Sequence, residues 1–159
     1  MENKKVQIVN MANGCVGINI PELHFKRVWE KRDAKINVDL DILKEIIYDT
    51  GVRNMFEQGI LYIEDMEVKK ELGLEPEDAK TPTNIIKLDE AFLKRLANFM
   101  PAREFEAQMA TLTYEQKHQV AEYMIANECS DFNKADIVQK LIGIDVVSAI
   151  KLNRAAAAD

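Results

Sequence analysis

The stretch "KVQIVNMANGCVGINI", residues 5–20, decides how the first part of the chain is interpreted. Apolar residues alternate with polar ones on both sides of Asn13-Gly14. An Asn-Gly pair between two alternating runs predicts a β-hairpin with a type I′ turn, because both central residues of that turn need a positive φ. We therefore expect two paired strands over 5–12 and 15–20.

The same stretch has a second interpretation, as a phosphate-binding loop. Gly14 and Gly17 bracket two small residues, and glycine-rich loops can present backbone N–H groups to a phosphate. Such a loop leads into a helix whose N-terminus meets the anion. Here the glycines lead into another alternating run, so we interpret Gly14 as the turn and Gly17 as a strand glycine or bulge.

The chain continues as a small antiparallel β-module with inserted helices. Further short strands are expected over 23–29 and 36–38, separated by the charged turn "KRDAK", and another over 60–63. Helical spacing predicts a helix capped by Asp39 that runs to about Tyr48, and a second over 52–58 that stops at Gly59. A short helix ending near Gly73 completes this module, which we place at residues 1–75.

The remaining chain predicts helices. Residues 76–88 are interpreted as a linker, and residues 89–159 as a bundle of four or five helices. Pro101 separates the first two helices, "TYEQ" (113–116) has the form of a capping box, and Gly143 and Asp145 mark the boundary before the last helix. The predicted fold class is α+β, with the helical bundle following the β-module.

Composition bounds the classes of function. The formal net charge is −6, with 27 acidic residues against 21 basic ones, which disfavours non-specific binding to nucleic acid and to anionic membranes. No apolar run approaches the length of a membrane span, and the N-terminus lacks the apolar segment of a signal peptide. We therefore expect synthesis in the cytoplasm and no membrane partner.

Candidate catalytic and metal-binding groups are few. Cys15, Cys129, His24 and His118 lack the spacing of a zinc site, and Cys129 with His118 makes a poor dyad. Glu64, Asp65 and Glu67 could bind Mg²⁺ or act as acid and base, but acids also gather in the first turn of a helix because the helix dipole favours them there. We predict no enzyme, no metal and no cofactor.

A basic patch is the best candidate for a binding surface. Five basic residues and two acids lie between positions 26 and 35, next to the only tryptophan. Three interpretations stay open: a solvated edge protected against strand pairing, a surface for docking onto acidic proteins or other copies of the chain, and a site for single-stranded nucleic acid. The predicted partner-binding residues are Phe25, Lys26, Arg27, Val28, Trp29, Lys31, Arg32 and Lys35.

The last two predicted helices have a helix-turn-helix outline. A recognition helix needs Arg, Lys, Asn or Gln facing the groove, and "DVVSAIKLNR" carries these only in its last turn. Residues 113–154 hold five basic and six acidic side chains, so this part has no basic footprint. Packing of one helix on the other is the stronger interpretation.

Three stretches carry a resemblance to a known family. They are "GCVGINIPEL" (14–23), the tryptophan followed by the basic turn, and "YDTGVRNMFEQGILYIEDMEVKKELGLEP" (48–76). In these stretches the chain resembles uncharacterised virion structural or assembly proteins of tailed phages and prophages. The resemblance implies a non-enzymatic protein of the virion that binds other virion or assembly proteins and copies of itself. The alternative is a nucleic-acid-binding or regulatory protein that uses residues 26–35 or the C-terminal helices.

Overall fold

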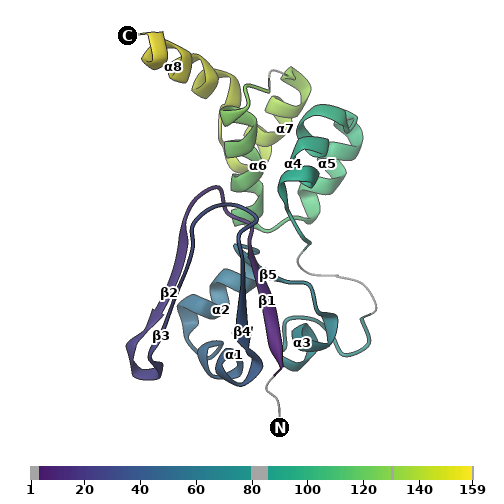
Figure 1. Ribbon diagram of the computed structural model, residues 1–159. Helices are drawn as coiled ribbons and strands as arrows, with labels where there is room; N and C mark the ends of the chain where they lie inside the picture. Colours follow the sequence, from purple (N-terminus) through teal and green to yellow (C-terminus); the bar gives the residue numbers. More distant parts are fainter. Residues whose placement is uncertain (1–3, 80–85, 130, 159) are drawn as a thin grey trace. The chain divides into compact units, whose positions relative to one another are not determined.

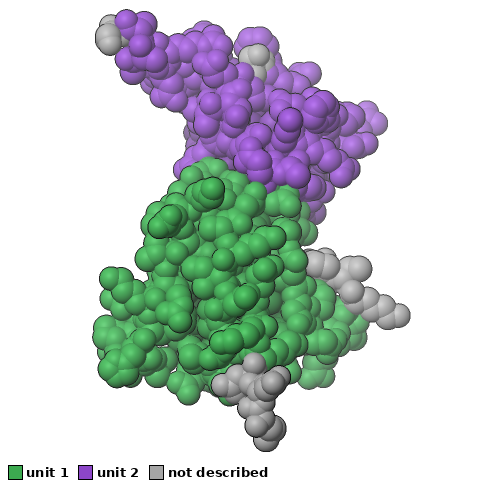
Figure 2. Space-filling view, in the orientation of Figure 1, with its two compact units in different colours: residues 1–89 green, residues 90–159 purple. Residues whose placement is uncertain are grey.

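The computed structural model describes residues 4–79, 86–129 and 131–158, and the chain divides into two compact units, residues 1–89 and 90–159 (Figure 2). All strands in these ranges belong to the first unit, and the second is helical, which confirms the α+β class. The segment predicted as a linker, 76–88, lies partly outside the described residues. Two of its described residues, Ala79 and Leu88, are buried and belong to the first unit.

Unit 1 contains two small antiparallel sheets, and its helices follow the fourth strand in sequence (Figure 1). One sheet has three strands in the order β4-β1-β5, and the other is a two-stranded ribbon formed by β2 and β3. The elements are β1 (Lys5–Asn10), β2 (Val16–Ile20), the 3-10 turn η1 (Pro21–Leu23), β3 (Phe25–Trp29), β4 (Lys35–Asp39), α1 (Leu40–Ile46), α2 (Thr50–Glu57), β5 (Leu61–Ile63) and α3 (Met66–Glu71).

The predicted Asn13-Gly14 hairpin is wrong. β1 pairs with β4 and β5, whereas β2 pairs with β3. Neither Asn13 nor Gly14 has the positive φ that a type I′ turn requires. The turn that reverses the chain lies at η1 and His24, where His24 adopts φ 50° and donates its backbone N–H to Pro21 O.

Residues 5–39 instead form one long hairpin that bends in the middle. The pairing of β1 with β4 ends at Val9↔Lys35, and the pairing of β2 with β3 begins at Val16↔Trp29. Between these two pairs lie six residues on one arm (10–15) and five on the other (30–34). An unequal count of this kind bends a ribbon, as a β-bulge does. The bend explains why alternation continues on both sides of Asn13-Gly14 although the two runs never pair.

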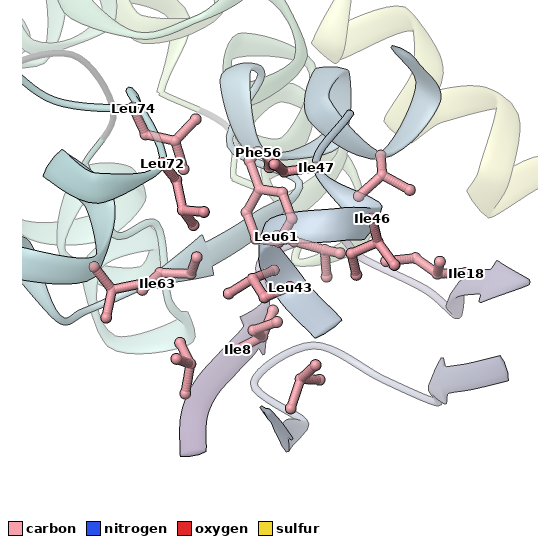
Figure 3. Close-up of a cluster of buried hydrophobic side chains, with 14 of the residues drawn as sticks. Ile8, Ile18, Leu43, Ile46, Ile47, Phe56, Leu61, Ile63, Leu72 and Leu74 are labelled. Atoms are coloured by element: carbon pink, nitrogen blue, oxygen red, sulfur yellow. The ribbon is translucent and has the colours of Figure 1, made fainter. Parts of the chain in front are cut away.

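The core of unit 1 lies between the two sheets and the helices (Figure 3). Ile8 and Ile63 from the three-stranded sheet, Ile18 from the ribbon, and Leu43 and Phe56 from α1 and α2 belong to one buried cluster. The alternation of β1 puts Ile8 on this face and Val9 on the other, where Val9 is buried with Met11 and Tyr62. The ribbon contributes to this core through its inner face.

Unit 2 confirms the predicted helices. Thr113 and Gln116 form the capping box, Asp145 Oδ1 accepts a hydrogen bond from Ser148 N, and Gly143 ends its helix in the left-handed conformation. The elements are α4 (Glu90–Lys94), the π-helical turn η2 (Arg95–Phe99), α5 (Ala102–Thr111), α6 (Tyr114–Ala126), α7 (Phe132–Ile142) and α8 (Val146–Ala158).

The sequence pattern of unit 2 gives two local expectations that the structure corrects: an inward face shared by Phe92, Leu96 and Phe99, and a helix cap at Asn133. Helical spacing places Phe99 on the same inward face as Leu96, yet Phe99 is 72% exposed. The buried face of this segment is formed by Leu93, Leu96, Ala97 and Met100, an i, i+3, i+4, i+7 set, and Phe99 lies outside it. The cap of α7 is Asp131 rather than Asn133, whose own N–H is bonded to the Asp131 carboxylate.

Candidate functional site

The β2–β3 ribbon, residues 16–29, has one buried and one solvent-facing side. Phe25 and Trp29 are 3% and 0% exposed and belong to the core. Because side chains alternate along a strand, Lys26 and Val28 point to the opposite side, where they stand across from Asn19 and Gly17. We call the exposed residues Gly17, Asn19, Lys26 and Val28 the outer face of the ribbon.

The structure therefore separates the predicted partner-binding residues into two groups. Lys26, Arg27, Val28, Lys31 and Lys35 are exposed, and Val28 keeps 44% of its surface accessible.

The other three, Phe25, Trp29 and Arg32, are needed for the fold. The Trp29 indole N–H donates to Ile8 O at 3.0 Å, so its ring joins the ribbon to the central strand. Phe25 and Trp29, two of the predicted partner-binding residues, thus lie in the core of their own unit and are not exposed to a partner.

The bend, residues 10–15 and 30–34, joins the ribbon to the three-stranded sheet and is stabilised by Asn10 and Arg32. Asn10 is fully buried; its amide donates to Gly14 O and Lys31 O at 2.8 and 2.9 Å and accepts from Ala12 N at 2.8 Å. The Arg32 guanidinium donates to Met11 O, to Leu88 O and to the Asn13 side chain. Both arms of the long hairpin are thus connected where strand pairing stops, which fixes the direction of the ribbon.

Three cations of the ribbon and the bend have no carboxylate partner within the described residues: Lys26, Arg27 and Lys31. The Arg27 guanidinium lies 5.0 Å from the Phe25 ring centroid and donates to Lys26 O. Lys35 differs from these three, because its charge helps to lower the pKa of Glu64. The ribbon and the bend therefore carry three exposed positive charges that have no ion pair with a described residue.

The acidic candidates Glu64, Asp65 and Glu67 do not form a reactive group. Each contacts a lysine: Glu64 contacts Lys87, Asp65 contacts Lys4 at 2.9 Å, and Glu67 contacts Lys70 at 3.5 Å. The hydrogen bonds from Lys87 and Lys4 lower the pKa of Glu64 and of Asp65.

Asp65 also caps α3 by accepting from Glu67 N and Val68 N, as the helix-dipole interpretation expects. Over the described ranges, no three His, Cys, Asp or Glu side chains gather in a way that could hold a metal ion.

Two of the remaining candidates, Cys129 and His118, have contacts inside the chain, whereas Cys15 is an exposed free thiol. The Cys129 thiol is buried and lies 3.2 Å from Ala97 O, while the His118 ring contacts the Tyr114 ring. A hollow of about 300 Å³ beside the exposed Tyr48 is lined by Lys44 and Arg53, whose charges are paired with Glu71 and Glu57. None of these arrangements brings a nucleophile, a base and an open cavity together.

Comparisons with protein-family models, curated proteins and solved structures find no match. The structure also contains no helix, among those described, that is long and apolar enough to cross a membrane. The assignment of function therefore depends on the geometry of the ribbon.

Proposed function

We propose that the chain is a non-enzymatic structural or assembly component of a tailed-phage particle and docks onto an acidic surface of another virion protein through the ribbon. The sequence resemblance to virion proteins supports the first part. The outer face of the ribbon supports the second, because an exposed apolar residue, Val28, stands there with Lys26, which has no carboxylate partner among the described residues. A small apolar centre with a charged rim is the usual arrangement of a docking surface.

The proposal depends above all on the glycine at position 17, which the fold does not require. It lies opposite Val28, has no positive φ, and a Cβ built on it would meet its nearest neighbours at 3.7 and 3.8 Å, an ordinary contact distance. The fold therefore does not require glycine here, and glycine weakens a strand. A bare backbone beside Val28 lets the surface of a partner approach the ribbon closely, which accounts for the residue.

The ribbon fits nucleic acid less well. Single-stranded nucleic acid binds to basic grooves that also offer aromatic rings for stacking. The two aromatic residues of the ribbon, Phe25 and Trp29, are buried, so the ribbon offers phosphate contacts alone. The net charge of −6 opposes binding that depends on charge without stacking.

The variant Gly17→Thr tests the proposal without a loss of stability. A β-branched residue favours a strand, so we expect the free energy of unfolding to be unchanged or up to about 1 kcal/mol higher. The added side chain should nevertheless prevent close approach at the outer face. In phages that carry this variant as their only copy, mass spectrometry of purified particles should show the chain strongly depleted.

Gly14→Thr is the matched control. Gly14 is also exposed with room for a side chain, but it lies at the bend rather than on the outer face. We expect normal incorporation of this variant. Equal incorporation of both variants would rule out docking by the outer face, and the absence of the wild-type chain from particles and from assembly intermediates would rule out the virion role itself.

A further inference from the structure

Lys69 is a buried lysine in the last turn of α3. The helix ends in a Schellman motif: Leu74 N donates to Lys69 O at 2.8 Å, Gly73 N donates to Lys70 O at 3.1 Å, and Gly73 adopts φ 75°. In this motif the residue after the glycine packs against the residue whose carbonyl it contacts. The stem of Lys69 is therefore held under Leu74, and the residue is only 3% exposed.

The ammonium group of Lys69 has no hydrogen-bond partner within the described part of the chain. Its Nζ lies 4.0 Å from the centroid of the Tyr62 ring, which attracts the charge but accepts no conventional hydrogen bond. An ammonium has three N–H donors, and leaving buried donors unbonded is costly. Lys69 belongs to the small set of buried polar groups that need a further partner.

A cavity of about 10 Å³ lies beside this group. Lys69, Tyr62 and Glu75 supply its polar lining, and the side chains of Phe56, Leu61, Ile63 and Leu74 supply the apolar part. Glu75 is 5% exposed, and its charge acts on Lys69, so a carboxylate lies close to the ammonium at the same cavity. This volume is about that of one water-sized probe, so the cavity admits no organic ligand.

We propose that this cavity binds a single water molecule that accepts a hydrogen bond from Lys69 Nζ and donates one to the Glu75 carboxylate. Buried waters typically bond to buried donors that lack another partner, as the Lys69 ammonium does among the described residues. An anion is excluded because Glu64 and Glu75 both act electrostatically on Lys69. The water joins the end of α3 to the chain that follows it, and the inference is independent of the proposed function.

A crystal structure of the full chain at a resolution that shows ordered waters tests this inference. We expect one water peak about 3 Å from Lys69 Nζ and within hydrogen-bond distance of Glu75. In Lys69→Met the peak should be lost, and in the control Lys70→Met it should remain, because Lys70 pairs with Glu67 outside the cavity.

The wild-type crystal decides the question even if Lys69→Met does not fold. A direct hydrogen bond from Nζ to Glu75 or to a backbone carbonyl, with no density in the cavity, would overturn the proposal. Density larger than one water would also overturn it. Retention of the peak in Lys69→Met would show that the ammonium does not hold the water.

Discussion

Lys134 is a buried charge that replaces a helix cap. It is 2% exposed, and its Nζ donates to Leu96 O and Ala97 O at 2.8 and 3.1 Å. These carbonyls belong to η2, where the chain leaves the helix and the last carbonyls lose their intrahelical donors. A cation at the C-terminal end of a helix also interacts favourably with the helix dipole.

We expect Lys134→Met to lower the free energy of unfolding by about 1–3 kcal/mol, because it leaves two buried carbonyls without these donors while keeping the volume of the stem. Chemical denaturation measures the change. Lys140→Met, which removes an exposed ion pair of the same helix, should cost less than about 1 kcal/mol. Equal effects of the two substitutions would show that Lys134 stabilises the unit by its charge alone.

Tyr62 gives a pH-dependent prediction at the same scale. Burial raises the pKa of Tyr62 to about 12, and the carboxylates of Glu64 and Glu75 add to this effect. In the unfolded chain a tyrosine ionises near pH 10, so between about pH 10 and 12 the unfolded state releases this proton first. Stability should therefore fall with rising pH over this window.

Tyr62→Phe isolates the effect. The phenolate absorbance step that this variant lacks should be centred near pH 12 in the folded wild-type protein, and the variant should lose less stability between pH 10 and 12. If the absorbance step that Tyr62→Phe removes is instead centred near pH 10, the hydroxyl group of Tyr62 is not buried as the structure shows.

At the scale of elements, the sequence predicted what local chemistry determines. The capping box at Thr113, the end of α7 at Gly143 and the end of α3 at Gly73 each depend on residues within one turn of each other. Strand positions were also predictable from alternation. Strand pairing was not, because Asn13-Gly14 is compatible with both a hairpin turn and a bend, and only the contacts of Asn10 and Arg32 with distant residues decide between them.

The candidate site was predictable in position but not in composition. The basic residues near positions 26–35 indicate an exposed surface, and five of the eight predicted residues are exposed. Trp29 was misassigned because a loosely alternating strand does not reveal which of its faces is buried. The position of Gly17 opposite Val28 and the place of Lys69 beside a cavity could not be predicted, since they depend on strand pairing and on packing between distant residues.

Trp29 and Val28 test the two faces of the ribbon. Trp29→Ala removes a fully buried ring and its hydrogen bond to Ile8 O, so we expect it to cost about 3–5 kcal/mol of unfolding free energy. Val28→Ala, one residue away on the outer face, should change stability by about 0.5 kcal/mol or less. Urea unfolding of both variants measures the difference, and a similar cost for the two would contradict the assignment of faces.

At the scale of the whole molecule, charge is distributed unevenly. The chain carries a net charge of −6. Within the described ranges, Lys26, Arg27 and Lys31 have no ion pair, whereas the α3 acids Glu67 and Glu71 pair with lysines. A basic ribbon on an acidic protein favours an orientation of approach, because unlike surfaces attract and like surfaces repel. Docking through the ribbon should therefore weaken as salt concentration rises.

The division into two units predicts how the chain can be dissected. Residues 1–89 have their own buried cluster and hold the ribbon, whereas residues 90–159 contain helices alone in their described part. We expect each piece to fold when produced separately, with an amide NMR spectrum that overlays on that of the full chain. Residues 1–89 added in excess during particle assembly should displace the full chain, because they carry the outer face of the ribbon, and residues 90–159 should not. Displacement by the helical piece alone would place the docking surface on the bundle instead.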